Sequence, residues 1–382
     1  YCVQDAALCN RLMTHLHIWE DLTEMAKICN VQPFTLYTQG QQIKVFSQVY
    51  KFCMYKNIVV ERDGYAVKDT DHYVGAQVFD PMSGYHKNVV PFDFESLYPT
   101  TIIAYNIDYS TWVTDENIPD SLCNVMEWWD HIGCEHDPKI IRKKELSDYI
   151  DTERSKIKIL RDNRNSTKDN YLKLKIKSEI DERVDNLKPY ISERGELNKC
   201  KPKHLMCIKR KYRWRKEPMG VIPTIIQNLL AARKKTRKGG EGSIADNKNK
   251  IDELEQKLSK LSGKKREQIE TEIEEIQSTI AVLDKRQIAY KLSANSMYGG
   301  FGVRKGYIPF MPGAMCTTYM GRTNIEKVAT TIPEKYGGKL IYGDTDSNYI
   351  VFPHLNNSQE TWDYSEKVAD EVTKLFPKPI QL

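Results

Sequence analysis

The chain has 382 residues, of which 40% are hydrophobic, and its formal net charge is +5. That length predicts two or three domains with buried cores. No stretch is apolar enough to span a bilayer or has the pattern of a signal peptide, and the nine cysteines lack the spacing of a disulfide framework. We therefore expect no membrane contact, reduced thiols and an intracellular protein. Basic residues cluster at positions 199–216 and 233–238, where they favour binding to a phosphate backbone.

The first predicted elements are one helix and two strands. Residues 5–30 have apolar side chains at helical spacing, which predicts a helix with one apolar face. Residues 59–67 and 85–94 have the composition and alternation of strands. The apolar face of the helix would consist of Leu8, Leu12, Leu16, Trp19 and Leu22.

Two long charged segments follow. Residues 142–187 have helical spacing and are best interpreted as a solvated helical insertion, with a partner-binding arm as the alternative. Residues 247–283 carry two apolar stripes separated by Ser262 and Gly263, which predicts an antiparallel helical hairpin with coiled-coil spacing. A free-standing coiled-coil module is the weaker interpretation, because the second helix continues into Lys291. Glycines at 239–242 predict the end of the preceding helix.

The sequence YGDTDS at 342–347 contains two carboxylates at a tight turn between apolar, β-branched flanks, which predicts a hairpin. In a strand, residues two apart project to the same side, so Asp344 and Asp346 would repel each other unless a cation lay between them. Hard oxygen ligands on a rigid element suit Mg²⁺ and a phosphoryl or nucleotidyl transfer. The alternative is a solvated turn, which an Asp-x-Asp sequence alone usually forms.

Two further segments strengthen the transfer hypothesis. The strand ending at Asp93 would present one carboxylate and one backbone carbonyl to a metal, although a buried Asp that caps the next helix is also common. Lys291, Asn295 and Tyr298 fall on one helical face that would suit a triphosphate, a sugar and a base. An ordinary amphipathic face is the alternative. Glycines at 299–300 predict the end of this helix.

Three segments resemble motifs A, B and C of family B DNA polymerases in the family's order: DFESLYP at 93–99, KLSANSMYG at 291–299 and YGDTDS at 342–347. The resemblance covers the whole chain apart from the two insertions and is nearest to the delta-type branch, as found in large DNA viruses. Other segments that are similar to the family are YCVQD at 1–5 (third exonuclease motif), QGQQIKV at 39–45 (linker), YVGA at 73–76 (the Y-x-G-G loop, with Ala76 for the second Gly), 220–235 (first fingers helix) and TYMGR at 318–322 (palm helix).

This resemblance implies a mixed α+β fold: a polymerase palm with an antiparallel sheet backed by helices, a helical fingers hairpin and the end of an RNase H-like exonuclease domain. It implies a fragment that lacks the thumb and runs from the last exonuclease motif to the palm. The expected domains are 1–55 (end of the exonuclease domain and connector), 56–218 (first part of the palm, with an insertion at about 135–215), 219–298 (fingers, with an insertion at about 243–283) and 299–382 (second part of the palm).

The resemblance also assigns roles to individual residues. It implies two Mg²⁺ ions held by Asp93, Asp346 and the backbone carbonyl of Phe94, with Asp344 in a less direct role. Tyr98 would exclude a ribose 2′-hydroxyl. The remaining expected contacts are the triphosphate clamp (Lys291, Arg233 and Arg237, with Lys238 as a rival of Arg237), backbone amides to phosphate (Ser96 and Leu97), the nascent base pair (Asn295 and Tyr298) and DNA (Tyr73, Gly75, Thr318 and Arg322).

The implied partners are primer-template DNA and deoxynucleoside triphosphates, in the nucleus or a viral replication compartment. A sliding clamp or processivity factor would bind through regions outside the chain. A 3′→5′ exonuclease is expected only in a full-length protein, where Asp5 would bind metal and Tyr1 would orient water; a helix start capped by Asp5 explains this segment equally well.

Two other functional classes share some of these features. Polymerases that make or copy RNA also use a paired acidic turn, but the resemblance of Tyr98 to a sugar gate favours DNA synthesis. A catalytically inactive polymerase-like scaffold usually loses its acids, whereas Asp93, Asp344 and Asp346 are all present.

One further pattern stands apart from these motifs. Cysteine and histidine residues on either side of the first insertion have the spacing of a structural Zn²⁺ site, which would fix the two ends of an inserted arm. The alternative is that they are ordinary packed or exposed side chains. The candidates are Cys134, His136, Cys200, His204 and Cys207.

Overall fold

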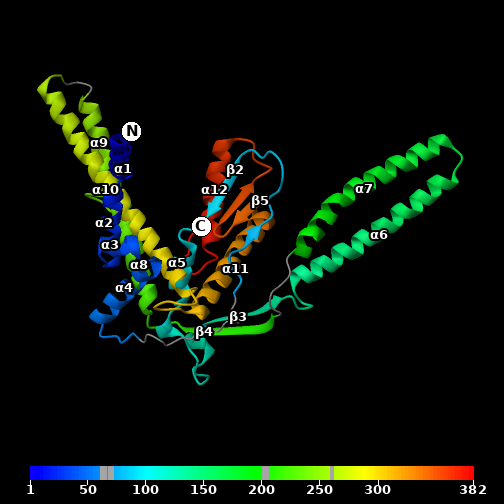
Figure 1. Ribbon diagram of the computed structural model, residues 1–382, viewed down its shortest axis with the longest axis horizontal. Coiled ribbons are helices and arrows are strands. Elements are labelled where there is room, and N and C mark those ends of the chain that lie inside the picture. The colour runs from blue at the N-terminus through cyan, green and yellow to red at the C-terminus, as the bar shows by residue number, and fades with distance from the viewer. Residues whose placement is uncertain (61–66, 68–72, 200–205, 259–261) are drawn as a thin grey trace. The chain divides into compact units, whose positions relative to one another are not determined.

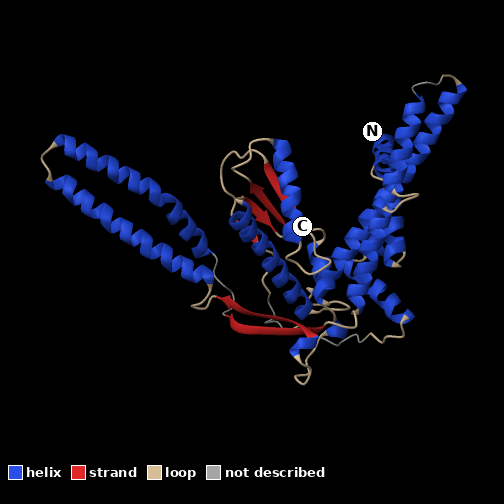
Figure 2. Ribbon diagram, turned by 180° about the vertical axis from the view of Figure 1, so that it is seen from behind, coloured by secondary structure: helices blue, strands red, loops and turns tan. Residues whose placement is uncertain are grey.

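The structure is a computed structural model that describes residues 1–60, 67, 73–199, 206–258 and 262–382. The chain divides into two compact units, one made of residues 1–125 and 212–382 and the other of residues 126–211. Long helices and small sheets occur together (Figure 2), so the expected mixed α+β class is confirmed. Within the described ranges, no helix has both the length and the apolar character that a membrane crossing would require.

A four-stranded antiparallel sheet lies at the centre of the first unit, with the strand order β1-β5-β6-β2. The predicted strand at 85–94 begins only at residue 89, and β1 was not predicted. Val59 and Val60 are not in a strand, and most of the other strand predicted there lies outside the described residues. The strands are β1 (Val78–Phe79), β2 (Val89–Asp93), β5 (Lys339–Asp344) and β6 (Ser347–Val351).

The register of this sheet brings its acidic residues to one end. Ser347 is opposite Asp93 on β2 and opposite Asp344 on β5, so both acids lie beside the turn that joins β5 to β6. Thr345 forms that turn with a left-handed φ of 55°. The backbone N–H of Phe94 donates to the carbonyl of Asp346 over 2.9 Å, which ties the end of β2 directly to the turn.

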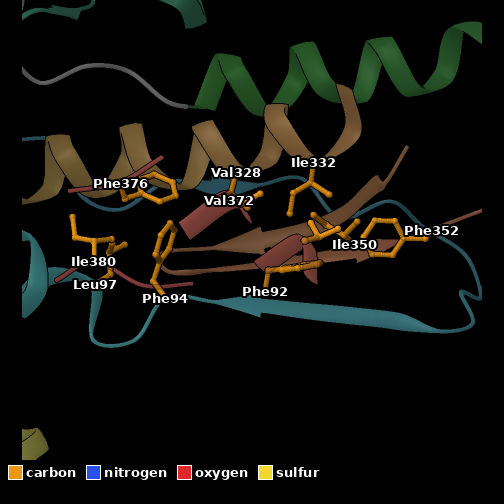
Figure 3. Close-up of a cluster of buried hydrophobic side chains, with 11 residues drawn as sticks. Phe92, Phe94, Leu97, Val328, Ile332, Ile350, Phe352, Val372, Phe376 and Ile380 are labelled. Atoms are coloured by element: carbon orange, nitrogen blue, oxygen red, sulfur yellow. The ribbon is translucent and has the colours of Figure 1, made fainter. Parts of the chain in front are cut away.

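Helices α11 (Met311–Tyr336) and α12 (Ser358–Thr373) pack on one face of the sheet through a buried apolar cluster (Figure 3). Phe92 and Phe94 both join this cluster because side chains two apart in a strand point the same way. Asp93, between them, therefore points to the opposite face. The cluster contains Phe92, Phe94, Leu97, Val328, Ile332, Ile350, Phe352, Val368, Val372, Phe376 and Ile380.

Three helices of the first unit pack along one another: α8 (Val221–Lys238), α9 (Ile244–Leu258) and α10 (Lys264–Phe301) (Figure 1). The predicted hairpin is present, with Gly263 at the N-cap of α10 at a φ of 63°. Helix α8 ends at Gly239, as the glycine run predicts. The predicted end of α10 at residues 299–300 is wrong by a few residues, because the helix continues to a cap at Gly302.

The N-terminal helices are four short ones, so the single helix predicted at 5–30 is wrong. His17 adopts a left-handed φ of 53° and separates the first two helices. The expected apolar face does not lie in a core, since Leu8, Leu12, Leu16 and Trp19 are all exposed. Helices α2 and α4 pack against α10. The bounds are α1 (Cys2–His15), α2 (Ile18–Cys29), α3 (Pro33–Thr38) and α4 (Gln41–Tyr55).

The second unit contains a long helical hairpin. Helices α6 (Pro138–Ser166) and α7 (Asn170–Lys199) run side by side, so the charged segment predicted at 142–187 is two helices joined by a short turn (Figure 1). Strands on either side of the hairpin pair with each other as a two-stranded sheet, β3 (Cys123–Ile132) with β4 (Met206–Arg215). The remaining elements, in the first unit, are α5 (Leu97–Tyr105) and the 3₁₀ turns η1 (Tyr109–Thr111) and η2 (Asp120–Leu122).

Candidate functional site

A cavity of about 370 Å³ lies in the first unit, where the acidic end of the sheet meets α5, α8 and α10. It is large enough for a small-molecule ligand. Residues from four separate parts of the sequence line it, and they include most of the residues that the sequence predicted for metal and nucleotide binding. The lining residues are Asp93, Phe94, Glu95, Ser96, Leu97, Tyr98, Pro99, Arg233, Arg237, Lys291, Asn295, Tyr298, Thr345 and Asp346.

Two carboxylates face this cavity. Asp93 is the last residue of β2, and Asp346 follows the left-handed turn at Thr345. Partial burial raises the pKa of Asp93, and the negative charge of Asp346 raises it further, whereas Lys291 lowers it. The pKa of Asp346 is also raised, first by burial and then by the charge of Asp344. Two neighbouring acids with raised pKa values, one of which is raised by the charge of the other, form a site that a cation would stabilise.

Asp344 takes a different position from Asp346. Its carboxylate accepts hydrogen bonds from the hydroxyl of Thr345 over 2.7 Å and from the hydroxyl of Tyr342 over 3.3 Å. Asp346 is among the residues that line the cavity, whereas Asp344 is not. Asp344 acts on the cavity through its charge, which contributes to the raised pKa of Asp346.

Three cationic side chains line the same cavity. Lys291 comes from α10, and Arg233 and Arg237 come from successive turns of α8. Gln287 on α10 accepts a hydrogen bond from Nε of Arg233 over 3.2 Å, which fixes the guanidinium between the two helices. Burial lowers the pKa of Arg233, and the neighbouring charge of Arg237 lowers it further. These helices therefore concentrate positive charge opposite the two acids.

Two tyrosines close another side of the cavity. The rings of Tyr98 and Tyr298 have centroids 4.5 Å apart, and burial raises the pKa of both hydroxyls. Tyr298 shares α10 with Asn295 and Lys291, so the predicted helical face is present in the structure and points into the cavity. Ser96 begins α5 with a left-handed φ of 54°, which turns the chain from β2 into the helix that carries Tyr98.

The family model for "DNA polymerase family B" matches residues 31–264 and 256–382, which together make up most of the chain. The chain belongs to DNA polymerase family B. It is 46% identical to DNA polymerase 120R of Invertebrate iridescent virus 3, with 100% of this chain covering 30% of that protein. It is 39% identical to DNA polymerase 037L of Invertebrate iridescent virus 6, with 100% of this chain covering 33% of that protein. The chain thus spans about a third of the length of these curated relatives.

Among solved structures, the family B DNA polymerase from the hyperthermophilic archaeon Pyrobaculum calidifontis matches with a TM-score of 0.47 and 17% identity, covering 93% of this chain and 32% of that one.

The residues of this family B chain that were predicted to contact DNA lie around α11 and the loop at 73–75. Arg322 on α11 donates to the carbonyls of Val74 and Gly75, each over 2.7 Å, and so holds that loop. Tyr73 lies next to Tyr298 and contributes to its raised pKa. Thr318 is buried, and its hydroxyl donates to the carbonyl of Ala314 one turn earlier, so it supports the helix that carries Arg322.

Some lining residues of the family B site were not predicted. Glu95 and Pro99 belong to the same DFESLYP segment as Asp93, and Thr345 lies between the two acids, so the motifs themselves were the signal. The charge of Glu95 favours the charged form of Arg233 and so opposes the lowering of its pKa. At the other end of the chain, Tyr1 and Asp5 are exposed, with Asp5 in the first turns of α1.

The cysteine and histidine pattern is only partly covered by the described residues. Cys134, His136 and Cys207 come together in the second unit, and His131, which was not predicted, joins them. Cys200 and His204 lie outside the described residues.

Proposed function

We propose that this chain carries the active centre of a template-directed DNA polymerase that adds deoxynucleotides to a primer 3′ end during replication. The observation that supports this most strongly is the one cavity that unites Asp93 and Asp346 with Lys291, Arg233 and the ring of Tyr98. A site with paired acids beside clustered cations suits nucleotidyl transfer. In that reaction the primer 3′-hydroxyl oxygen bonds to the α-phosphorus of a bound triphosphate, and the bond from that phosphorus to pyrophosphate breaks.

The acids supply the site for divalent metal. Asp93 and Asp346 would hold two Mg²⁺ ions together with the backbone carbonyl of Phe94, whose side chain is buried in the core and leaves only its main chain toward the cavity. The raised pKa values of both acids support this assignment, because a bound cation removes their mutual repulsion. Bound Mg²⁺ would lower the pKa of the primer 3′-hydroxyl and neutralise the leaving pyrophosphate. Asp344 would add negative charge behind Asp346.

The cationic side chains would bind the triphosphate. Arg233 and Arg237 present planar donors suited to two phosphate oxygens, whereas Lys291 acts as a compact charge. The backbone amides at Ser96 and Leu97, at the start of α5, would add neutral donors. Since these groups are already held on three helices, the phosphates would be positioned with little reorganisation.

The tyrosines and Asn295 would select the nucleotide. The ring of Tyr98 packs against Tyr298 and would occupy the space that a 2′-hydroxyl needs, which is a repulsive form of discrimination. Asn295 and Tyr298 would line the nascent base pair. Tyr73, Gly75 and Arg322 would contact the DNA, while Thr318 would act through its helix.

Binding of primer-template DNA would depend on phosphates and shape rather than on sequence, and would weaken strongly with salt. Both named relatives are viral DNA polymerases, so we place the reaction in viral DNA replication, in the nucleus or a viral replication compartment. A 3′→5′ exonuclease is expected only in a full-length protein, and a processivity factor would bind through regions outside this chain.

The test is primer extension by the full-length protein in the presence of Mg²⁺, with either deoxyribonucleoside or ribonucleoside triphosphates. Asp346→Ala should reduce extension about a thousandfold or more, because one of the two metal-binding carboxylates is lost. Asp252→Ala, at an exposed position on α9, is the matched control and should extend normally. Normal extension by Asp346→Ala would contradict the metal assignment. No extension by the wild-type protein would favour the inactive scaffold instead.

A further inference from the structure

Four metal-binding side chains gather in the second unit, and the polymerase reaction uses none of them. One ligand atom from each of His131, Cys134, His136 and Cys207 lies within 4.8 Å of all the others. The cluster shares no residue with the carboxylate cavity. Its donors are two thiols and two imidazoles, which select zinc, whereas carboxylate and carbonyl oxygens select Mg²⁺.

The distances between these atoms match a tetrahedral zinc site. With ordinary Zn–S and Zn–N bond lengths, sulfur and nitrogen ligands at tetrahedral angles lie about 3.5 Å apart. Nδ1 of His131 lies 3.4 Å from Sγ of Cys134 and 3.5 Å from Sγ of Cys207. Nδ1 of His136 lies 4.0 Å from Sγ of Cys207. One ion could therefore contact all four atoms with only small movements of the side chains.

The backbone around the cluster is fixed on both sides. Gly133 follows β3 with a left-handed φ of 67° and forms a bridge with Met206, the first residue of β4. Its N–H donates to the carboxylate of Asp137 over 2.6 Å, and the same carboxylate caps α6 by accepting from the N–H of Lys139 over 2.9 Å. This short loop holds Cys134 and His136, and the β-bridge brings Cys207 beside it.

A disulfide between Cys134 and Cys207 would explain the two sulfurs but not the two imidazoles. Both thiols are free in the structure. The rings of His131 and His136 have centroids 5.3 Å apart and converge on the same sulfur, Sγ of Cys207. Four protein ligands occupy all four coordination positions of a tetrahedral Zn²⁺ ion. This is typical of a structural zinc site, because a catalytic site keeps one position open for water or substrate.

We propose that His131, Cys134, His136 and Cys207 bind one structural Zn²⁺ ion at the base of the α6–α7 hairpin. The ion would connect the end of β3, the loop that starts α6 and the start of β4, so both ends of the helical hairpin would be fixed at one point. Binding would release the thiol protons, because thiolates are the zinc ligands. The hairpin ends need such a connection because the paired helices are mostly charged and solvated, with little apolar core of their own.

The test is metal analysis of the longest natural form of the protein, purified without added metal or chelator. Cys134→Ser and Cys207→Ser should each lower the zinc content by about one ion per chain relative to the wild type. Cys9→Ser, at an exposed cysteine on α1, is the matched control and should retain all the zinc. Equal zinc content in the wild type and both variants would overturn the proposal.

A second measurement applies if the variants fail to fold. Wild-type protein reconstituted with Co²⁺ should show thiolate-to-metal charge transfer and the visible absorption of tetrahedral cobalt, and Zn²⁺ should displace both signals. Absence of these bands in folded protein would overturn the proposal. A bond between Cys134 and Cys207 that is found by peptide mapping of freshly purified protein would also overturn it.

Discussion

Gly321 on α11 lies directly against the ring of Tyr98 on α5. A Cβ atom at position 321 would be 2.7 Å from Cε1 of that ring, closer than side-chain carbons pack. The absence of a side chain at Gly321 therefore sets how far Tyr98 can withdraw from the cavity. The TYMGR segment thus contributes to the candidate site through its glycine, although that glycine does not line the cavity.

We predict that Gly321→Ala moves the ring of Tyr98 and changes sugar selection. The new methyl group would force the ring toward the cavity, so deoxynucleotide incorporation should fall and the fold should lose about 1–3 kcal/mol through overpacking. Gly195→Ala is the matched control, because Gly195 lies in α7 with open space around its Cβ position, and it should gain up to about 1 kcal/mol from helix propensity. Extension kinetics with both nucleotide types, together with thermal unfolding, check this. Unchanged kinetics and stability in Gly321→Ala would contradict the close contact.

Adjacent cations on α8 should differ in their effect on triphosphate binding. Both Arg237 and Lys238 line a hollow beside Pro379 and Gln381, but only Arg237 of the two also lines the cavity of the two acids. Loss of a charge-assisted hydrogen bond to phosphate removes about 1.5–3 kcal/mol, so Arg237→Ala should raise KM for deoxynucleotides about tenfold or more. Lys238→Ala removes the same charge from the same helix end and should change KM less than about twofold. Equal effects would mean that only the general charge of the helix end matters.

Local spacing predicted part of the cavity lining, and the resemblance to family B polymerases supplied other residues, including Tyr98, Arg233 and Arg237. The two-residue period of a strand places Asp93 on the face opposite the core. The 3.6-residue period of a helix places Lys291, Asn295 and Tyr298 on one face, and neither period depends on the rest of the chain. The chain order of the three motifs then indicated that these faces meet. Arg237 could be separated from Lys238 only in three dimensions, because the direction of each side chain depends on how α8 packs against α10.

The failures arose where structure depends on contacts that are distant in sequence. The apolar spacing across residues 5–30 is the same whether or not His17 breaks the helix, so periodicity could not find that break. Strand β1 is only two residues long, which is too short to show an alternating pattern. It forms because the carbonyl of Gln77 accepts a hydrogen bond from the N–H of Thr345 and Val78 pairs with Asp344. His131 lies inside a strand, and only the pairing of β3 with β4 shows that it faces Cys207.

We predict that Arg286 stabilises the packing of α2 on α10 through a buried acid. Both carboxylate oxygens of Glu24 accept hydrogen bonds from Arg286, at 2.6 and 3.2 Å, and this interaction lowers the pKa of Glu24. A lowered carboxyl pKa stabilises the fold above the unfolded value of about 4.3, and that contribution is lost as pH falls through the folded value. Arg286→Ala should therefore cost about 1–2 kcal/mol at neutral pH and progressively less below about pH 4.

Lys27→Ala is the control for this pair. Lys27 also contacts Glu24, over 3.1 Å, but its own side chain is mostly exposed, so its removal should cost less than about 1 kcal/mol. Denaturant unfolding of the three proteins from pH 3 to pH 7 makes the comparison. A cost for Arg286→Ala that does not change with pH would show that the contribution comes from packing of the arginine stem.

The last prediction concerns the stability cost of the acids in the cavity. Burial and the charge of Asp344 raise the pKa of Asp346, so ionisation of Asp346 destabilises the metal-free fold at neutral pH. This cost is fully present above the raised folded pKa and disappears as pH falls below the unfolded value of about 3.9, where both states are protonated. Asp346→Asn should therefore stabilise the metal-free protein at pH 7, by about 1 kcal/mol or less because solvent screens a half-exposed group, and should have no effect at low pH.

Added Mg²⁺ should reverse the order of stability of the two proteins, because it binds and stabilises the wild-type site more than the variant. Thermal unfolding with chelator and with Mg²⁺ measures both effects, with Asp252→Asn on α9 as the exposed control. A metal-free variant that melts below the wild type at pH 7 would contradict the predicted cost, and a melting order that Mg²⁺ leaves unchanged would contradict the metal assignment.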